Sequence, residues 1–189
     1  MNPQIEVLLE VLPRPTNFRI MDILIKQARW EIAADSTKLS AEKFTEVLDK
    51  EKDLGFTYKT FDFYQNINLP IELNTYANLI FDSIQKHCRS YKITRPIRYL
   101  WNYYNKGSEG TWHIDNGNDP EGKYVTAVYS LNMCDGGTEL KMNEGEPDKL
   151  YLSRPSTALV FDSSRLHKGI GPKKYIGRFN LTIMMEIKE

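Results

Sequence analysis

The sequence lacks several features that would place it in a specialised class of protein. It has only two cysteines, too few for a disulfide framework, and no run of about 18 or more apolar residues of the kind that crosses a membrane. Acidic and basic residues both number 25, so no basic excess is available to bind a nucleic-acid backbone. The opening MNPQIEVLLEVLP lacks the basic start of a secretory signal. We therefore expect a cytoplasmic protein with reduced cysteines, no membrane span and no nucleic-acid partner.

What is present describes one globular domain. The chain has 189 residues, of which 41% are hydrophobic and 26% are charged. These values are typical of a single domain that buries a real core. The pattern changes near residue 95, with a helical or mixed supporting region at 1–95 and a strand-rich core at 96–189. Nothing in the sequence decides the oligomeric state.

The supporting region contains at least one amphipathic helix. Residues 71–90 follow Pro70 and carry an apolar stripe at three- and four-residue steps, formed by Leu73, Tyr76, Ile80, Ile84 and His87. Because His87 lies on this stripe, we interpret it as a packed or partly exposed histidine and not as a metal ligand. Ser40 is a candidate N-cap for a shorter helix, and residues 5–12 fit a helix or a strand equally well.

The second half reads as a series of short strands separated by turns. The turns are rich in Gly, Asn, Asp and Pro, as in NKGSEG, CDGG and NEGEPD. The segments between them are rich in Val, Ile, Tyr, Thr and Phe, and six are predicted strands: 97–104, 123–132, 138–142, 149–153, 157–162 and 178–187. We therefore predict an α+β protein with a mainly β core, built as a sandwich or barrel and backed by N-terminal helices.

The short motif WHIDN, at 112–116, contains a candidate pair of metal ligands. On an extended chain, residues two apart point to the same side, so His113 and Asp115 can bind one ion while Ile114 turns away. His167 follows the predicted strand at 157–162 and is the candidate third ligand. Two histidines and one carboxylate leave three adjacent positions open on the metal, as a non-haem Fe(II) oxygenase requires.

A candidate anion-binding residue opens the last predicted strand. Within GRFNLT, the side chains of Arg178, Asn180 and Thr182 share one face, together with Met184 further on. If that face lines the interior, the guanidinium group is buried and needs a planar anion, most naturally a carboxylate that accepts two hydrogen bonds. An ordinary salt bridge to an acidic residue distant in sequence is the alternative.

From 97 to 187 the chain resembles the Fe(II)- and 2-oxoglutarate-dependent oxygenases, in particular their prolyl-hydroxylase-like branch. The resemblance rests on five motifs in order: YYNKGSEGTWHIDN, YVTAVYSLN, GGTEL, LVFDSSRLHKG and GRFNLT. It implies a double-stranded β-helix, or jelly roll, with Fe(II) bound by His113, Asp115 and His167. It also implies 2-oxoglutarate and O2 as cosubstrates. Residues 1–95 contain no motif of this family.

The resemblance also implies which residues contact the cosubstrate. Arg178 would hold the distal carboxylate of 2-oxoglutarate, with Thr182 as a hydroxyl donor deeper in the site. Tyr103 or Tyr104 would approach from the strand before the metal motif, and its offset from His113 favours Tyr103. This chain departs from the family's pattern at two positions. Ser130 occupies the place where related prolyl hydroxylases carry a tyrosine that shares the distal carboxylate, and Asn180 replaces a frequent serine.

The expected activity is hydroxylation of a peptidyl proline or another protein side chain, with release of succinate and CO2. Asn116, Trp112 and Tyr104 are weaker candidates for substrate contact, and the loop at 116–122 is a candidate wall of the substrate cleft. Three alternatives stay open: the same chemistry on a small molecule, a β-helix module without turnover, and a zinc hydrolase. In the hydrolase, Glu109 or Asp119 would act as the general base.

Overall fold

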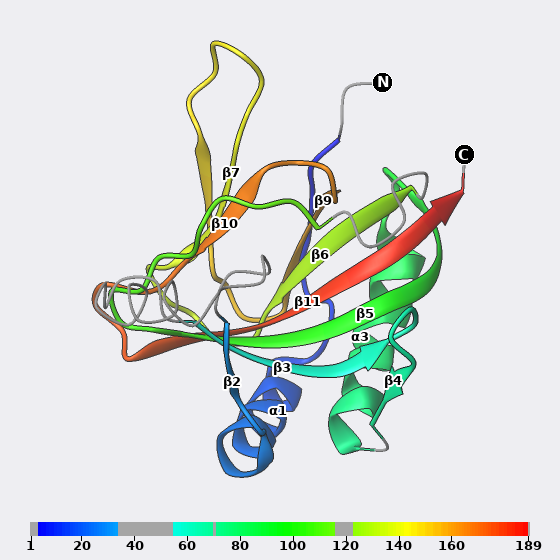
Figure 1. Cartoon of the computed structure of the whole chain (residues 1–189), viewed down its shortest axis with the longest axis vertical. Coiled ribbons are helices and arrows are strands. Elements are labelled where there is room, and N and C mark those ends of the chain that lie inside the picture. Colours follow the sequence, from blue (N-terminus) through cyan, green and yellow to red (C-terminus); the bar gives the residue numbers. More distant parts are fainter. Residues whose placement is uncertain (1–3, 34–54, 70, 116–122, 189) are drawn as a thin grey trace.

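The computed structural model describes residues 4–33, 55–69, 71–115 and 123–188. Two antiparallel sheets enclose the interior of a jelly roll (Figure 1). The larger sheet has eight strands, and seven of them follow the order β1 (Glu6–Leu8), β9 (Thr157–Asp162), β6 (Tyr124–Ser130), β11 (Gly177–Lys188), β5 (Lys92–Asn105), β3 (Gly55–Asp62) and β2 (Glu31–Ala33). The eighth strand, β4 (Ile67–Asn68), pairs with β3. The smaller sheet has the order β10 (His167–Ile170), β7 (Gly137–Leu140) and β8 (Lys149–Leu152).

Strand β6 is an interior strand of the larger sheet and is buried on both faces. It pairs with β11 on one side and β9 on the other, and all of its residues are buried. Side chains alternate between the two faces of a strand. Val125, Ala127 and Tyr129 join the main hydrophobic core, whereas Val128 belongs to a second cluster inside the jelly roll. The inner face of this sheet therefore carries the candidate site, and the outer face anchors the helices.

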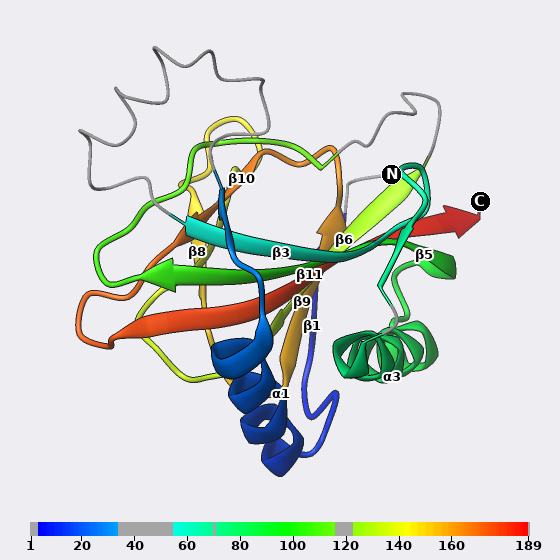
Figure 2. The ribbon, with the colours of Figure 1, turned by 60° about the horizontal axis from the view of Figure 1, so that its bottom comes forward.

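Two helices cover the outer face of the larger sheet (Figure 2). They are α1 (Arg14–Gln27) and α3 (Glu72–His87), and each buries residues at three- and four-residue steps, such as Ile20 and Leu24 in α1 and Ile80 and Ile84 in α3. Burying each such side chain stabilises the fold by about 1.5–3 kcal/mol. None of the helices in the described ranges has the length and apolar character that a bilayer crossing requires.

The secondary structure confirms most of the sequence-based predictions. All six predicted strands are present, as β5, β6, β7, β8, β9 and β11. The predicted helix at 71–90 is α3, and His87 is exposed at its last turn with its Nδ1 atom 2.8 Å from the Ser83 carbonyl oxygen. The short helix predicted after Ser40 lies outside the described residues.

The first 95 residues contribute more strand than the sequence indicated. The ambiguous segment at 5–12 forms β1, and β3 pairs with β5 over most of its length. Strand β3 escaped detection because most of its residues are half-buried on both faces, which gives no clear alternation. Strand β10 was also missed, because the glycines around it favoured a turn. Strand β5 begins at Lys92, just before the predicted change of character near residue 95.

Candidate metal centre

The two candidate histidine ligands lie directly opposite each other across a backbone bridge. The His113 N–H donates to the His167 carbonyl oxygen and the His167 N–H donates to the His113 carbonyl oxygen, both at 2.9 Å. Their ring centroids are 4.3 Å apart. Directly opposed residues in an antiparallel pair bring their side chains to the same face of the ladder. The backbone pairing therefore places both imidazoles side by side, although they are distant in sequence.

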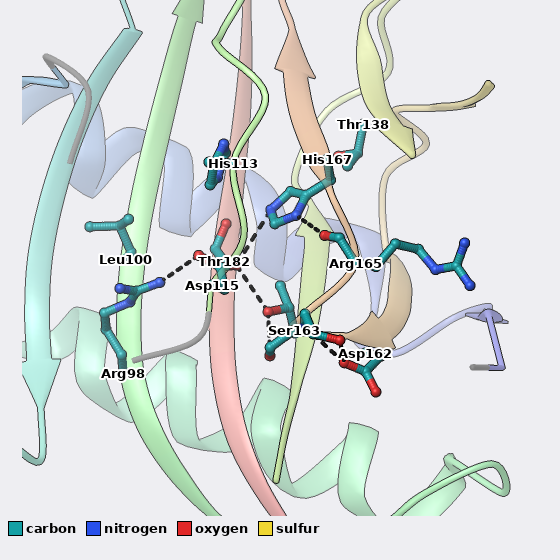
Figure 3. A network of polar contacts seen from close by, with 12 residues as sticks. Arg98, Leu100, His113, Asp115, Thr138, Asp162, Ser163, Arg165, His167 and Thr182 are labelled. Carbon is teal, nitrogen blue, oxygen red and sulfur yellow. Dashed lines mark hydrogen bonds and ion pairs between the residues drawn. The ribbon is translucent and has the colours of Figure 1, made fainter. Parts of the chain in front are cut away.

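Asp115 completes the cluster from the same extended segment as His113. Its backbone N–H donates to the Ser163 carbonyl oxygen at 2.8 Å, which fixes the segment against the end of β9. Its Oδ2 atom lies 3.4 Å from His167 Nε2 (Figure 3). One ligand atom from each of His113, Asp115 and His167 lies within 4.8 Å of the other two. The structure thus brings together the three residues that the sequence selected.

Backbone carbonyl groups fix the orientation of both imidazole rings. His113 Nδ1 lies 2.9 Å from the Thr111 carbonyl oxygen, and His167 Nδ1 lies 2.9 Å from the Arg165 carbonyl oxygen. A carbonyl oxygen can only accept, so each Nδ1 carries a proton, and in the neutral form of each ring Nε2 offers its lone pair. This arrangement is typical of histidines that bind a metal through Nε2.

Two further side chains hold the Asp115 carboxylate. Arg98 Nη2 donates to Oδ1 at 2.8 Å, and Thr126 Oγ1 donates to Oδ2 at 2.9 Å. In Figure 3, Arg98 reaches the carboxylate from β5 and His167 reaches it from the other side. Burial alone raises the pKa of Asp115, but the contact with His167 and the charge of Arg98 outweigh it and hold the pKa well below its usual range. The carboxylate is therefore ionised and available as a ligand.

Arg178 is a buried cation without an acidic partner among the described residues. Its side chain is 1% exposed. Its Nη1 atom donates to the Gly137 carbonyl oxygen, its Nη2 atom donates to Thr138 Oγ1 at 2.8 Å, and its Nε atom has no hydrogen-bond partner. Burial lowers the pKa of Arg178. Since burying an unpaired charge is costly, this group is set to receive an anion.

A small cavity connects the histidine–aspartate cluster with Arg178. Its walls come from β5, β6, β11 and the smaller sheet, and include Leu100, Tyr104, Val128, Thr138, Gly169 and Thr182. Asp115 is the only acidic residue among the described residues that line it. The cavity therefore has a candidate metal-ligand set and a buried cation without a described acidic partner on its walls.

Tyr104, and not Tyr103, faces this cavity. The Arg178 guanidinium carbon lies 5.2 Å from the centroid of the Tyr104 ring. Gly169 provides the space for this ring, because a Cβ atom at that position would lie 2.3 Å from the Tyr104 hydroxyl oxygen. Burial raises the pKa of Tyr104 and the charge of Asp115 adds to this effect, while Arg178 opposes it. The hydroxyl group therefore stays protonated near neutral pH.

The preference for Tyr103 is corrected by its position on the outer face of the sheet. Its ring packs against Phe179 with centroids 4.6 Å apart, and lies 6.2 Å from the ring of Trp30. The offset from His113 was misleading because neighbouring residues of a strand point to opposite faces. A difference of one residue therefore selects the wrong side.

The remaining candidates occupy different places. Thr182 lines the cavity and accepts a hydrogen bond from Asn102 Nδ2 at 3.0 Å. Ser130 is buried on the inner face of β6, in a neighbouring cavity that also reaches Arg178. The Trp112 ring lies between two ammonium groups, those of Lys141 at 4.7 Å and Lys168 at 4.8 Å, and does not line the metal cavity. Asn116 and the 116–122 loop lie outside the described residues.

Sequence reasoning did not select Arg98 or Asn102. Both lie on β5 at even positions, and they share the inward face with Leu100 and Tyr104. The alternation of that strand would have identified them once Tyr104 was known to face inward. Asn102 donates to Asn180 Oδ1 as well as to Thr182, so it links the two candidate residues of β11.

The larger and smaller sheets, with the metal-ligand cluster at one end, reproduce the jelly roll of solved non-haem Fe(II) and 2-oxoglutarate oxygenases. A prolyl hydroxylase from Trichoplax adhaerens, in complex with a hypoxia-inducible-factor peptide fragment, is 16% identical over 97% of this chain and 83% of that chain, with a TM-score of 0.64. A Pseudomonas putida prolyl-4-hydroxylase is 11% identical over 99% and 94%, with a TM-score of 0.64.

A third structure is that of the α-ketoglutarate-dependent carbocyclase SnoK from nogalamycin biosynthesis. It is 13% identical over 97% of this chain and 79% of that chain, with a TM-score of 0.65. No protein-family model matches the sequence, and the search of curated proteins gave no match. At these identities the comparisons establish the fold, which is the one that the resemblance predicted.

Proposed function

We propose that this protein is an Fe(II)- and 2-oxoglutarate-dependent oxygenase. The observation that carries the proposal is the pairing, within one cavity, of a two-histidine, one-carboxylate cluster with a buried arginine that lacks an acidic partner in the described residues. A cluster of metal-ligand residues alone is compatible with many kinds of reaction. The arginine adds a site for the far carboxylate of a dicarboxylic cosubstrate.

The residues present fit both groups. His113 and His167 offer Nε2 lone pairs, and Asp115 offers one ionised oxygen while Arg98 occupies the other. Arg178 would bind the distal carboxylate of 2-oxoglutarate. Bound Fe(II), with 2-oxoglutarate and O2, supplies oxidative decarboxylation to succinate and CO2 coupled to hydroxylation of the substrate.

The protein's own contribution is to orient the bound cosubstrate and to exclude water from the cavity. Tyr104 lies against the Arg178 guanidinium group and limits where a carboxylate can sit. The Asn102 side chain donates to Thr182 Oγ1, so that hydroxyl group is left to donate its own proton into the cavity. Leu100 and Val128 provide apolar walls, which strengthen the charge interactions inside.

The substrate that we propose is a peptidyl proline or another protein side chain. The prolyl hydroxylases with the same fold support this choice, one of them in complex with a peptide. A small-molecule substrate is the second candidate, because SnoK, a carbocyclase of nogalamycin biosynthesis, has the same fold. We further propose a cytoplasmic location, supported by the free thiols of Cys88 and Cys134. The zero net charge argues against a nucleic-acid substrate.

A zinc hydrolase has less support. Glu109, one of its candidate general bases, is exposed, is paired with Lys168 and does not line the metal cavity. Asp119, the other, lies outside the described residues. A module without turnover would have no reason to keep a buried cation beside a complete ligand set.

The test is anaerobic addition of Fe(II) and 2-oxoglutarate to the metal-free protein. We expect the weak visible charge-transfer band of the metal–cosubstrate chelate, and no band when Zn(II) replaces Fe(II). A protein that binds Fe(II) but gives no band at any 2-oxoglutarate concentration would refute the proposal. Peptide and small-molecule libraries can then be screened for stimulation of succinate release in air.

A further inference from the structure

A second cavity reaches Arg178 from the side of the jelly roll. Its volume is about 280 Å³, and it shares Val128, Thr138 and Arg178 with the metal cavity. It lies beside β1 and β8, which are end strands of the larger and the smaller sheet. We call it the lateral cavity. The same guanidinium group thus lines two cavities.

The inner end of the lateral cavity suits a carboxylate. Arg178 is 1% exposed, and the hydroxyl-bearing residues Thr138 and Ser130 beside it are 4% and 6% exposed. The cavity has two charged lining residues, Arg178 and Arg154, both cations, and no acidic residue among its described lining. Arg178 Nε has no hydrogen-bond partner. A buried cation with nearby hydroxyl donors is matched by an ionised carboxyl group.

The outer end of the lateral cavity is apolar. Val7 and Leu9 from the β1 side are 49% and 69% exposed, and Leu150 and Leu152 from β8 are 41% and 50% exposed. Four large aliphatic side chains gathered around one opening form an exposed apolar patch, which commonly marks a binding site. A dicarboxylate such as 2-oxoglutarate would gain nothing from this opening, whereas an alkyl chain would be removed from water there.

We propose that the lateral cavity binds a small amphiphilic carboxylate, of the medium-chain fatty acid class. The carboxylate would pair with Arg178 and the alkyl chain would lie between the residues of β1 and β8. Since a water molecule occupies about 30 Å³ of the liquid, the cavity has room for about nine water molecules. Octanoate is close to this size.

Binding at this site would be mutually exclusive with binding of the cosubstrate. Both ligands would use the Arg178 guanidinium group, one from each side, so the fatty carboxylate would act as a competitive inhibitor towards 2-oxoglutarate. This consequence rests on the proposed function, whereas the binding itself does not. The two can therefore be tested separately.

The first experiment is calorimetric titration of the metal-free full chain with octanoate. We expect octanoate to bind saturably to one site. We expect 1-octanol to bind at least about tenfold more weakly than octanoate, because it lacks the charge that Arg178 would pair with. Leu152→Asp, at an exposed position of the opening, should weaken octanoate binding by about tenfold or more, because it adds a negative charge to the path of the carboxylate and removes apolar surface.

Ile25→Asp is the matched control, since Ile25 is 67% exposed on α1 and does not line the lateral cavity. It should leave octanoate binding unchanged. Thermal unfolding of both variants would show that they remain folded. Absence of saturable binding, equal binding of 1-octanol, or equal effects of the two substitutions would overturn the proposal.

The second experiment is competition in the Fe(II)-loaded, oxygen-free protein. The 2-oxoglutarate concentration that gives half of the maximal chelate absorbance should rise as octanoate is added. In Leu152→Asp the chelate should still form, but added octanoate should no longer raise this concentration. If octanoate binds but no chelate ever forms, the proposed function fails and the lateral site stands. If the chelate forms and octanoate does not displace 2-oxoglutarate, competition at Arg178 is refuted.

Discussion

Arg98 and Asp115 form an ion pair of 2.8 Å in which the arginine occupies one carboxylate oxygen and leaves the other turned towards His167. This relationship restricts how the aspartate can bind a metal. With Oδ1 engaged by Arg98, Asp115 is directed to offer Oδ2 alone, which keeps more of the metal's coordination positions open for other ligands. We therefore predict that Arg98 positions Asp115 for metal binding.

We predict that Arg98→Gln weakens Fe(II) binding by about 10- to 100-fold, as is usual when the hydrogen-bond partner of a ligand is removed. The measurement is a Co(II) or Fe(II) titration of the metal-free protein, together with thermal unfolding. Arg95→Gln is the control, because Arg95 is exposed and pairs with Glu186. Unchanged metal affinity in Arg98→Gln would show that the ion pair only stabilises the fold.

His113→Ala should abolish Fe(II)-dependent succinate production and remove bound metal, because one imidazole Nε2 of the cluster is lost. Succinate release and metal content after dialysis are the measurements. His87→Ala makes the same chemical change at an exposed helical histidine and should retain both. Full succinate production by His113→Ala would exclude this residue as a ligand.

Arg178→Lys should weaken 2-oxoglutarate binding by about 10- to 100-fold, since an ammonium group cannot offer the planar pair of donors that a carboxylate accepts. Fe(II) affinity should stay close to that of the wild type, because Arg178 does not contact the histidines or Asp115 in the structure. The chelate band and a metal titration separate the two effects. A loss of metal binding as large as the loss of cosubstrate binding would contradict the assignment.

Tyr104→Phe and Tyr103→Phe form a matched pair on adjacent positions of β5. Removing the Tyr104 hydroxyl should weaken 2-oxoglutarate binding by about fivefold, the cost of roughly one hydrogen bond, because this group faces the cavity. The Tyr103 ring lies on the outer face against Phe179, so its hydroxyl should not matter for cosubstrate binding. Chelate titration distinguishes the two variants, and the reverse pattern would contradict the placement of this strand.

Glu6→Gln should reduce stability in a pH-dependent way. Burial alone raises the pKa of Glu6, but hydrogen bonds from Ser90 and from the Arg89 N–H outweigh it and leave the pKa lowered. When folding lowers the pKa of a carboxyl group, its ionised form stabilises the folded protein at pH values above the ordinary pKa. This stabilisation is lost as the pH falls through the pKa of the folded protein. We expect a loss of about 1 kcal/mol in the free energy of unfolding at pH 7.

The difference between wild type and Glu6→Gln should vanish below the folded pKa, where the wild-type carboxyl is protonated as well. Denaturant unfolding at pH 7 and at successively lower pH values measures it. Glu144→Gln, at an exposed position, should show no loss at any of these pH values. A constant difference across this range would mean that charge on Glu6 is not the cause.

The sequence by itself determined six strands of the core, the amphipathic helix α3 and the identity of the three clustered metal-ligand candidates. These are local properties: residues two apart on an extended chain share a side, and a three- to four-residue apolar repeat predicts a helix face. The same alternation along β11 predicted that Arg178 and Thr182 share a face, and the structure shows that this face is the inward one.

Only the tertiary structure decided which side of β5 faces inward. Both faces of that strand are covered, one by the jelly-roll interior and the other by residues such as Phe179, and a tyrosine lies on each, so residue type alone does not tell Tyr104 from Tyr103. The ion pair of Arg98 with Asp115, the pairing of His113 with His167 and the lateral cavity behind Arg178 all join residues far apart in sequence. Their positions depend on strand register and on how the two sheets meet, which no local pattern encodes.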